Sequence, residues 1–226
     1  GLEIGKCGPW SQGPVQLQTL ALLNEMGVAD WNPVSTDFVH GVTEALKLAF
    51  ADREAYYGDP DFVKVPLKQL LSREYNQERS KEISDRASLE LRPGKISGFE
   101  VRMPEFDSSG RGDERFSAMG IGEPTVSKKG ETRGDTCHVD VVDRWGNMVS
   151  ATPSGGWLQS SPVIPELGFC LNSRAQMFWL QEGLPATLAP GKRPRTTLTP
   201  SMALRDGKGY LAYGTPGGDQ QDQWQT

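Results

Sequence analysis

The sequence has little of what metalloproteins, membrane proteins and nucleic-acid-binding proteins depend on. It has 2 histidines in 226 residues and no HExxH pair, so a metal site is not expected. No stretch approaches the roughly 20 consecutive apolar residues of a membrane-spanning helix. There are 24 Lys and Arg against 29 Asp and Glu, a net charge of −5, and no basic run interleaved with aromatic residues, which argues against a nucleic-acid partner. No GxGxxG motif occurs, so a dinucleotide-binding fold is not expected. No cofactor is expected.

Cysteine is scarce as well. Cys7, Cys137 and Cys170 are odd in number and lack CxxC spacing. Free thiols are therefore the favoured interpretation, with a disulfide between two of them as the alternative. The chain begins at Gly1 and shows no charged-then-apolar leader, so we expect that the natural N-terminus is missing or was processed. The compartment is left open between the cytoplasm and a periplasmic or secreted location.

The first third of the sequence predicts helices. Apolar residues at helical spacing follow Gly13-Pro14, and a stronger helix is expected from a cap at residues 35–37 to Tyr57, just before the stop signal Gly58-Asp59-Pro60. Two shorter helices are expected over residues 67–71 and 75–83. This region, residues 1–101, is predicted to be mainly helical.

The character of the sequence then changes twice. Residues 102–135 are rich in Gly, Ser and charged residues without an apolar period, which predicts a long exposed loop. Residues 136–226 have the period of strands. One hairpin, with buried apolar positions, is expected across the turn 144–147, and another across residues 205–208. Helices followed by strands predict an α+β fold.

Candidate chemistry gathers where the loop ends and the strands begin. Thr136 opens the segment TCHVDVVDRWGN directly after the loop. Three further segments contribute small or hydroxyl-bearing residues, namely SATPSGGW (150–157), KRPRTTLTP (192–200) and YGTPGGDQQ (213–221). Together they offer a hydroxyl nucleophile, hydroxyl donors and glycine N–H groups, which is the set that acyl transfer needs.

These segments, in this order, resemble the gamma-glutamyltranspeptidase family of N-terminal-nucleophile hydrolases. ALKLAFADREAYYGDPDFVKVP (45–66), LRPGK (91–95), GFCLN (168–172) and GTPGG (214–218) add to the similarity, which covers nearly the whole chain. The resemblance implies an αββα sandwich that is incomplete at both ends, because the chain corresponds to the end of a large subunit and the start of a small one. The missing parts of both subunits are then its expected partners.

The resemblance also implies a mechanism. A precursor, or zymogen, would cut itself between Asp135 and Thr136, and the freed α-amino group of Thr136, with a pKa of about 8, would serve as base for its hydroxyl. By position, Ser154 would support the nucleophile, and Gly217 and Gly218 would offer N–H groups to the oxyanion. Thr196 and Thr197 stand where the family contacts the α-carboxylate end of its substrate. For His138 a structural role is the favoured reading.

The implied reaction is gamma-glutamyl transfer or hydrolysis, with a small-molecule donor such as glutathione and with water or an amine as acceptor. Three positions depart from the family pattern. Arg174 and Met177 replace a polar and an acidic residue that hold the substrate's α-ammonium group, and Gly156 replaces a hydrogen-bonding side chain. Arg174 would suit a carboxylate better. The alternatives are therefore an acylase for another, dicarboxylic (glutaryl-type) amide and a non-catalytic fragment that acts only in interactions.

Overall fold

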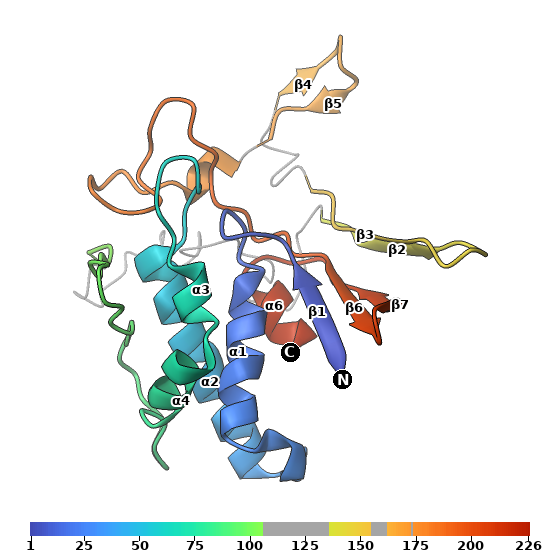
Figure 1. Cartoon of the computed structure of the whole chain (residues 1–226). Coiled ribbons are helices and arrows are strands. Elements are labelled where there is room, and N and C mark those ends of the chain that lie inside the picture. The colour runs from blue at the N-terminus through green and yellow to red at the C-terminus, as the bar shows by residue number, and fades with distance from the viewer. Residues whose placement is uncertain (106–135, 155–161, 173) are drawn as a thin grey trace, which may run out of the picture.

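The computed structural model describes residues 1–105, 136–154, 162–172 and 174–226. Helices packed beside a three-stranded sheet make up the body of the molecule, and two two-stranded hairpins project from it (Figure 1). The expected α+β character, with mixed helix and strand, is confirmed. Asp135, Gly156 and all but the first residues of the expected loop 102–135 lie outside the described residues.

The two long helices begin where local signals place them. Helix α1 (Pro14–Glu25) starts with a proline. Proline lacks an N–H, and at the first helical position this costs no hydrogen bond, because an N–H there would have no partner within the helix. Helix α2 (Thr36–Tyr56) is capped by Ser35, whose Oγ accepts the N–H of Phe38 at 3.2 Å. The short helices α3 (Leu67–Leu70) and α4 (Arg73–Ser80) and the 3-10 turn η1 (Val28–Asp30) complete this region. The helices predicted from the sequence are confirmed.

An apolar seam and a buried carboxylate hold the helices together. Leu22 and Leu23 of α1 pack against Ala45 and Leu48 of α2, and all four are buried. The seam excludes water between the two helices, and this burial is the main favourable term in their association. Nearby, Asp52 of α2 is fully buried and accepts hydrogen bonds from Gln18 of α1 and Tyr75 of α4, at 2.6 and 2.8 Å, and from the Gly94 N–H. These partners satisfy a charge that would otherwise be costly to bury.

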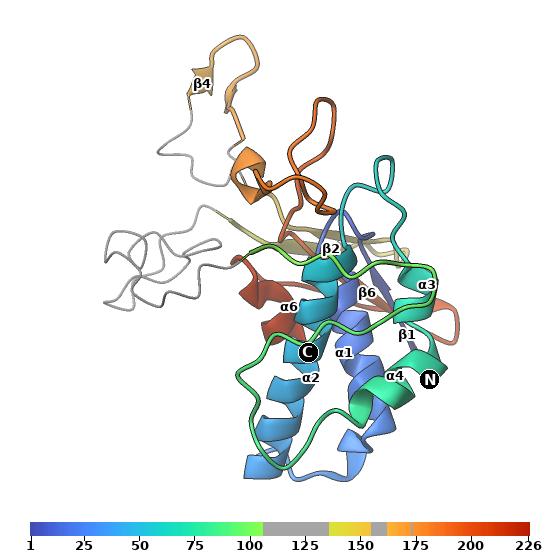
Figure 2. The same ribbon diagram turned by 90° about the vertical axis from the view of Figure 1, so that its left-hand side faces the viewer.

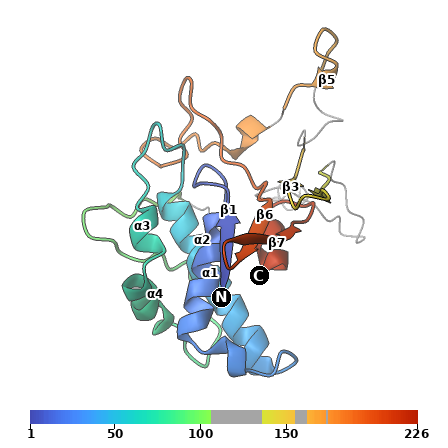
Figure 3. The ribbon, with the colours of Figure 1, turned by 45° about the vertical axis from the view of Figure 1, so that its right-hand side comes forward.

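The three-stranded sheet joins the two ends of the chain. Its order is β1 (Leu2–Lys6), β6 (Ser201–Arg205), β7 (Lys208–Tyr213), with all pairs antiparallel. Asp206 and Gly207, both with positive φ, make the tight β6–β7 turn that the sequence predicted. Strand β1 was not predicted. Figures 1 and 3 show α1 lying between α2 and this sheet.

The first predicted hairpin is present as β2 (Val139–Val142) and β3 (Met148–Ala151). The expectation that its apolar positions are buried is wrong, since Val139, Val141 and Val149 are 49%, 53% and 57% exposed. The hairpin contacts β7, but among the described residues no further layer covers these valine side chains (Figure 1). A second short hairpin, β4 (Val163–Ile164) with β5 (Phe169–Cys170), projects separately in both Figures 1 and 2.

Two further observations bear on the sequence expectations. None of the helices in the described part of the chain has the length and apolarity needed to span a bilayer. Cys7, Cys137 and Cys170 are free thiols, so the disulfide alternative is not realised in this structure.

Candidate active site

The β2–β3 register brings Thr136 and Ser154 together. Val139 pairs with Ala151, and the Cys137 N–H donates to the Pro153 carbonyl at 3.2 Å, so antiparallel pairing continues beyond the strand ends. Continued by one residue, the same register sets Thr136 opposite Ser154, and Thr136 Oγ1 donates to Ser154 Oγ at 2.9 Å. Side chains of opposed residues share a face of the hairpin. Thr136 itself lies three residues before β2 begins.

Arg174 reaches the same hydroxyl from a different segment. It begins the 3-10 turn η3 (Arg174–Met177), is 4% exposed, and donates from Nη2 to Ser154 Oγ at 3.2 Å. Its Nη1 donates to Thr197 Oγ1 at 3.3 Å. Because Ser154 Oγ accepts from both sides, Arg174 Nη2 lies within about 6 Å of Thr136 Oγ1. The site is therefore a chain of hydroxyls and one guanidinium.

The charge of Arg174 persists in this setting. Burial lowers the pKa of Arg174 to about 10, and Asp219 opposes the decrease. The guanidinium therefore stays protonated at neutral pH. A fixed cation at this distance favours negative charge on the Thr136 hydroxyl and disfavours a second cationic group nearby. Met177, at the other end of η3, is buried and apolar, so it adds no counter-charge.

Thr196 and Thr197 make different contacts. Thr197 is fully buried and contacts Arg174. The Thr196 backbone pairs with the loop before α1, since its N–H donates to the Trp10 carbonyl and its carbonyl accepts from Gln12 N–H. The Thr196 hydroxyl accepts the Leu198 N–H at 3.2 Å. The structure thus joins Thr197 to the site through Arg174 and uses Thr196 to fix the backbone of the segment.

The glycine turn precedes helix α6 (Gln220–Gln225). Gly217 has φ +132°, a conformation that other residues rarely adopt, and a Cβ there would make a tight contact of 3.1 Å with the ring of Trp224. Gln221 Nε2 donates to the Gly217 carbonyl at 2.5 Å, and the Gly218 N–H donates to Gln220 Oε1 at 3.3 Å. The turn is well defined, and its convergence on Thr136 stays a prediction.

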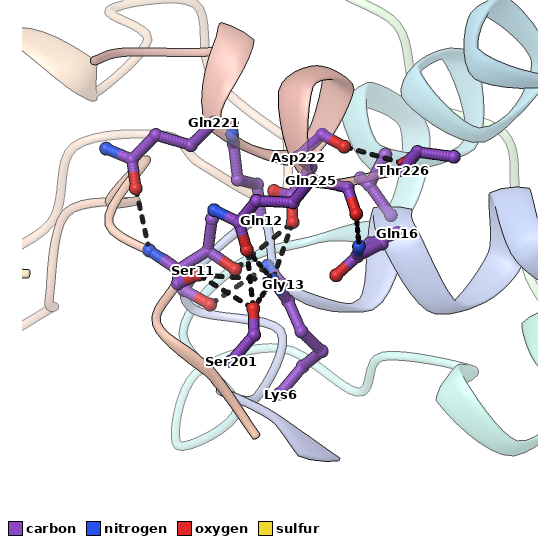
Figure 4. Close-up of polar contacts among 12 residues, drawn as sticks. Lys6, Ser11, Gln12, Gly13, Gln16, Ser201, Gln221, Asp222, Gln225 and Thr226 are labelled. Carbon is purple, nitrogen blue, oxygen red and sulfur yellow. Dashed lines mark hydrogen bonds and ion pairs between the residues drawn. The ribbon is translucent and has the colours of Figure 1, made fainter. Parts of the chain in front are cut away.

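Helix α6 is anchored by a buried network that sequence reasoning missed. Lys6 of β1 forms an ion pair with Asp222 at 3.0 Å, and both side chains are fully buried. Lys6 also donates to Ser201 Oγ at 2.5 Å (Figure 4). Thr199 Oγ1 donates to Asp222 Oδ1 at 3.1 Å. Burial raises the pKa of Asp222 to about 6 against the opposing charge of Lys6. No local signal marks these residues, because their partners come from opposite ends of the chain.

A second anchor holds the residue after the glycine turn. Arg53 of α2 donates to Asp219 Oδ1 at 3.1 Å, and Gln12 Nε2 donates to the Asp219 carbonyl at 3.3 Å. Burial would raise the pKa of Asp219, but Arg53 and then Arg195 outweigh it, so the pKa is lowered. Asp219 is therefore ionised at neutral pH. The glycine turn is fixed from the helical side as well as from the sheet.

Comparison with known proteins identifies the family. The gamma-glutamyltranspeptidase family profile matches residues 1–226, so the chain belongs to this family, as the sequence resemblance indicated. It is 31% identical to the "Glutathione hydrolase proenzyme" of Bacillus subtilis subsp. natto over 96% of this chain and 35% of that protein. It is 34% identical to the "Acylase ACY 1 proenzyme" of Pseudomonas sp. (strain SE83) over 95% of this chain and 33% of that protein.

A solved structure is also similar to this chain over its whole length. The "Structure of LmbA2991T421A" aligns with a TM-score of 0.78 and 56% sequence identity, covering 100% of this chain and 36% of that one. The chain therefore spans about a third of the length of the proteins it matches. The two curated relatives are both named as proenzymes, and one is named a hydrolase and the other an acylase.

Proposed function

We propose that the full-length protein cleaves amides through Thr136, after cutting its own chain between Asp135 and Thr136. The supporting observation is the hydrogen bond from Thr136 Oγ1 to Ser154 Oγ. Ser154 Oγ also accepts a hydrogen bond from the buried guanidinium of Arg174. These contacts orient the hydroxyl and place a positive charge near it. A nucleophile supported in this way suits acyl transfer.

The proposed reaction has two stages. Thr136 Oγ bonds to the acyl carbon of the donor, the C–N bond breaks, and the hydroxyl proton passes through the Thr136 α-amino group to the leaving amine. Water or an amine then attacks the resulting ester and restores the hydroxyl. Backbone N–H groups of Gly217 and Gly218 would stabilise the oxyanion in both stages. For the Gly218 N–H this requires release from Gln220 Oε1, an exchange that its 3.3 Å length makes easy.

Two donor classes compete for this site. The relative named glutathione hydrolase supports gamma-glutamyl amides, with Thr197 near the donor's α-carboxylate. The position of Arg174 between Ser154 and Thr197 favours the second class, dicarboxylic amides such as glutaryl amides. Such a donor carries a distal carboxylate that a guanidinium can bind and lacks the α-ammonium that it would repel. The relative named an acylase agrees with this class.

The proposal also assigns this chain to parts of two subunits. Residues 1–101 would be the end of a large subunit, 102–135 the processing segment, and 136–226 the start of a small subunit. The remaining parts of both would complete the αββα sandwich and the substrate pocket. The exposed valines of β2–β3 support this view, because apolar side chains on an uncovered hairpin are surface that further layers of such a sandwich would bury.

Self-cleavage provides the first test. On a denaturing gel the full-length protein should separate into two pieces that meet at residues 135 and 136. Thr136→Ala should abolish cleavage and amidase activity, whereas Thr136→Ser, which keeps a hydroxyl, should retain part of both. Cleavage that survives Thr136→Ala would refute the mechanism. An unprocessed, inactive wild-type protein would instead support the non-catalytic alternative.

A further inference from the structure

One face of the β2–β3 hairpin carries a continuous row of polar side chains. The pairing that sets Thr136 opposite Ser154 also sets His138 opposite Thr152. His138 Nδ1 lies 2.8 Å from Thr152 Oγ1, and Nε2 lies 2.7 Å from Asp140 Oδ2. An ionised carboxylate only accepts, so Nε2 carries a proton, and in the neutral ring Nδ1 accepts from the Thr152 hydroxyl. Both ring nitrogens are thus held, and the ring has one orientation.

The held ring lies directly on Gly214, at the end of β7. A Cβ added to Gly214 would fall 2.6 Å from His138 Nδ1 and 2.8 Å from Nε2, closer than side-chain carbons approach other atoms. Only a glycine lets the imidazole reach this position. Gly214 does not have a positive φ, so its backbone is one that alanine adopts as well. The glycine is needed here for the space it leaves and not for its conformation.

Two further contacts dock the hairpin on β7. Ser150 Oγ donates to the Tyr213 carbonyl at 3.2 Å, and the side chain of Met148 occupies the space where Gly209 would carry a Cβ. Along the sequence, the His138 contact is the nearest of the three to both parts of the proposed site. Thr136 is two residues before His138, and Gly217 is three residues after Gly214. Two residues of extended chain span only about 7 Å, so a shift of the ring would be transmitted to Thr136.

We propose that His138 is a positioning residue, whose ring, held by Asp140 and Thr152 and seated on Gly214, sets Thr136 relative to the Gly217–Gly218 turn. The inference rests on the proposed function, in which Thr136 is the nucleophile and the turn binds the oxyanion. The geometry of nucleophile and oxyanion donors matters most in the transition state. Loss of the contact between the His138 ring and Gly214 should therefore lower kcat and leave KM nearly unchanged.

The test is a double-mutant cycle in the full-length protein, with the anilide that the wild type hydrolyses fastest. Gly214→Ala should lower kcat at least tenfold with KM changed less than twofold, because the new methyl group displaces the ring. His138→Ala should also lower kcat. In the double variant the methyl group fills space that the ring has left, so kcat should be no lower than with His138→Ala alone. Gly5→Ala, in the same sheet with only ordinary contacts, is the matched control and should leave kcat unchanged.

Asp140→Asn extends the test if Gly214→Ala does not fold. It keeps the volume of the side chain but weakens its hold on the ring, so kcat should fall while KM is kept. Wild-type kcat in Gly214→Ala or in Asp140→Asn would overturn the inference, as would fully multiplicative losses in the double variant. The proposed function fails separately, if Thr136→Ala retains activity.

Discussion

Arg174 should decide which acyl donor the full-length protein prefers. Its Nη2 lies within about 6 Å of the hydroxyl of Thr136, the proposed nucleophile, because both groups hydrogen-bond to Ser154 Oγ. At about 6 Å and an effective dielectric constant of about 20, two unit positive charges repel by about 2–3 kcal/mol. A donor whose ammonium is held at this range would thus lose roughly 30-fold to 150-fold in kcat/KM. Since the pKa of Arg174 is about 10, the penalty applies throughout the neutral range.

Gamma-glutamyl and glutaryl anilides form a matched pair of substrates, because they differ only in the α-ammonium group. The wild type should prefer the glutaryl anilide. Arg174→Gln removes the charge but keeps a donor for Ser154, so the ratio of kcat/KM values should move toward the gamma-glutamyl donor by at least tenfold. Adding Met177→Asp, which supplies a partner for the ammonium, should extend the shift. Arg174→Lys, which keeps the charge, should preserve the glutaryl preference.

Two results would refute this reasoning. A wild-type protein that already prefers the gamma-glutamyl anilide strongly must hold the ammonium through another residue. A ratio of kcat/KM values that is the same in wild type, Arg174→Gln and Arg174→Lys would show that the charge of Arg174 does not reach the donor. A loss of activity toward both anilides in equal proportion belongs to the second case, because it leaves the ratio unchanged.

Two further predictions concern the anchor and the glycine turn. The folded protein holds a proton on Asp222 up to about pH 6, whereas an unfolded aspartate loses it near pH 4, so stability should fall as pH rises between these values. Asp222→Asn should remove this decline from melting curves, and an unchanged pH dependence would contradict the assignment. Gly217→Ala combines an unfavourable φ with a Cβ 3.1 Å from Trp224, and it should lower kcat by about 100-fold through a misplaced oxyanion donor. A kcat within twofold of wild type would show that the turn is not part of the oxyanion site.

Elements with local signals were predictable from the sequence. Pro14 and Ser35 mark the starts of α1 and α2, and Asp206-Gly207 defines the β6–β7 turn. Strand β1 has no comparable signal, because LEIGK is only 5 residues long with two apolar positions, and its strand conformation depends on pairing with β6. Lys6 and Ser201 are 195 positions apart, and such a pairing cannot be read from a local pattern. The valines of β2–β3 mislead for a related reason, since burial depends on what covers a strand.

Some contacts of the candidate site could be predicted from the sequence and others could not. The contact between Thr136 and Ser154 follows from the register of one hairpin. The sequence predicted this hairpin around residues 144–147 but did not give its register, and a slip of one residue would separate the two hydroxyls. The approach of Arg174 to Ser154 depends on a separate segment, and its alignment with the family suggested a pocket position without showing which hydroxyls it contacts. The contact between the His138 ring and Gly214 could not be predicted from the sequence either, because a glycine that leaves room for a ring cannot be distinguished there from any other turn glycine.

The pairing of β1 with β6 has a consequence for how the protein could unfold and refold. If the chain is cut before Thr136, β1 and Lys6 belong to one polypeptide, and β6 and Asp222 belong to another. The uncut precursor closes this pairing within a single chain, at an entropic cost that grows only slowly with the length of the loop. After the cut the same pairing joins two molecules, so recovery from denaturation would depend on protein concentration. The cleaved protein would then persist mainly because it unfolds slowly, having lost the covalent link with which it first folded.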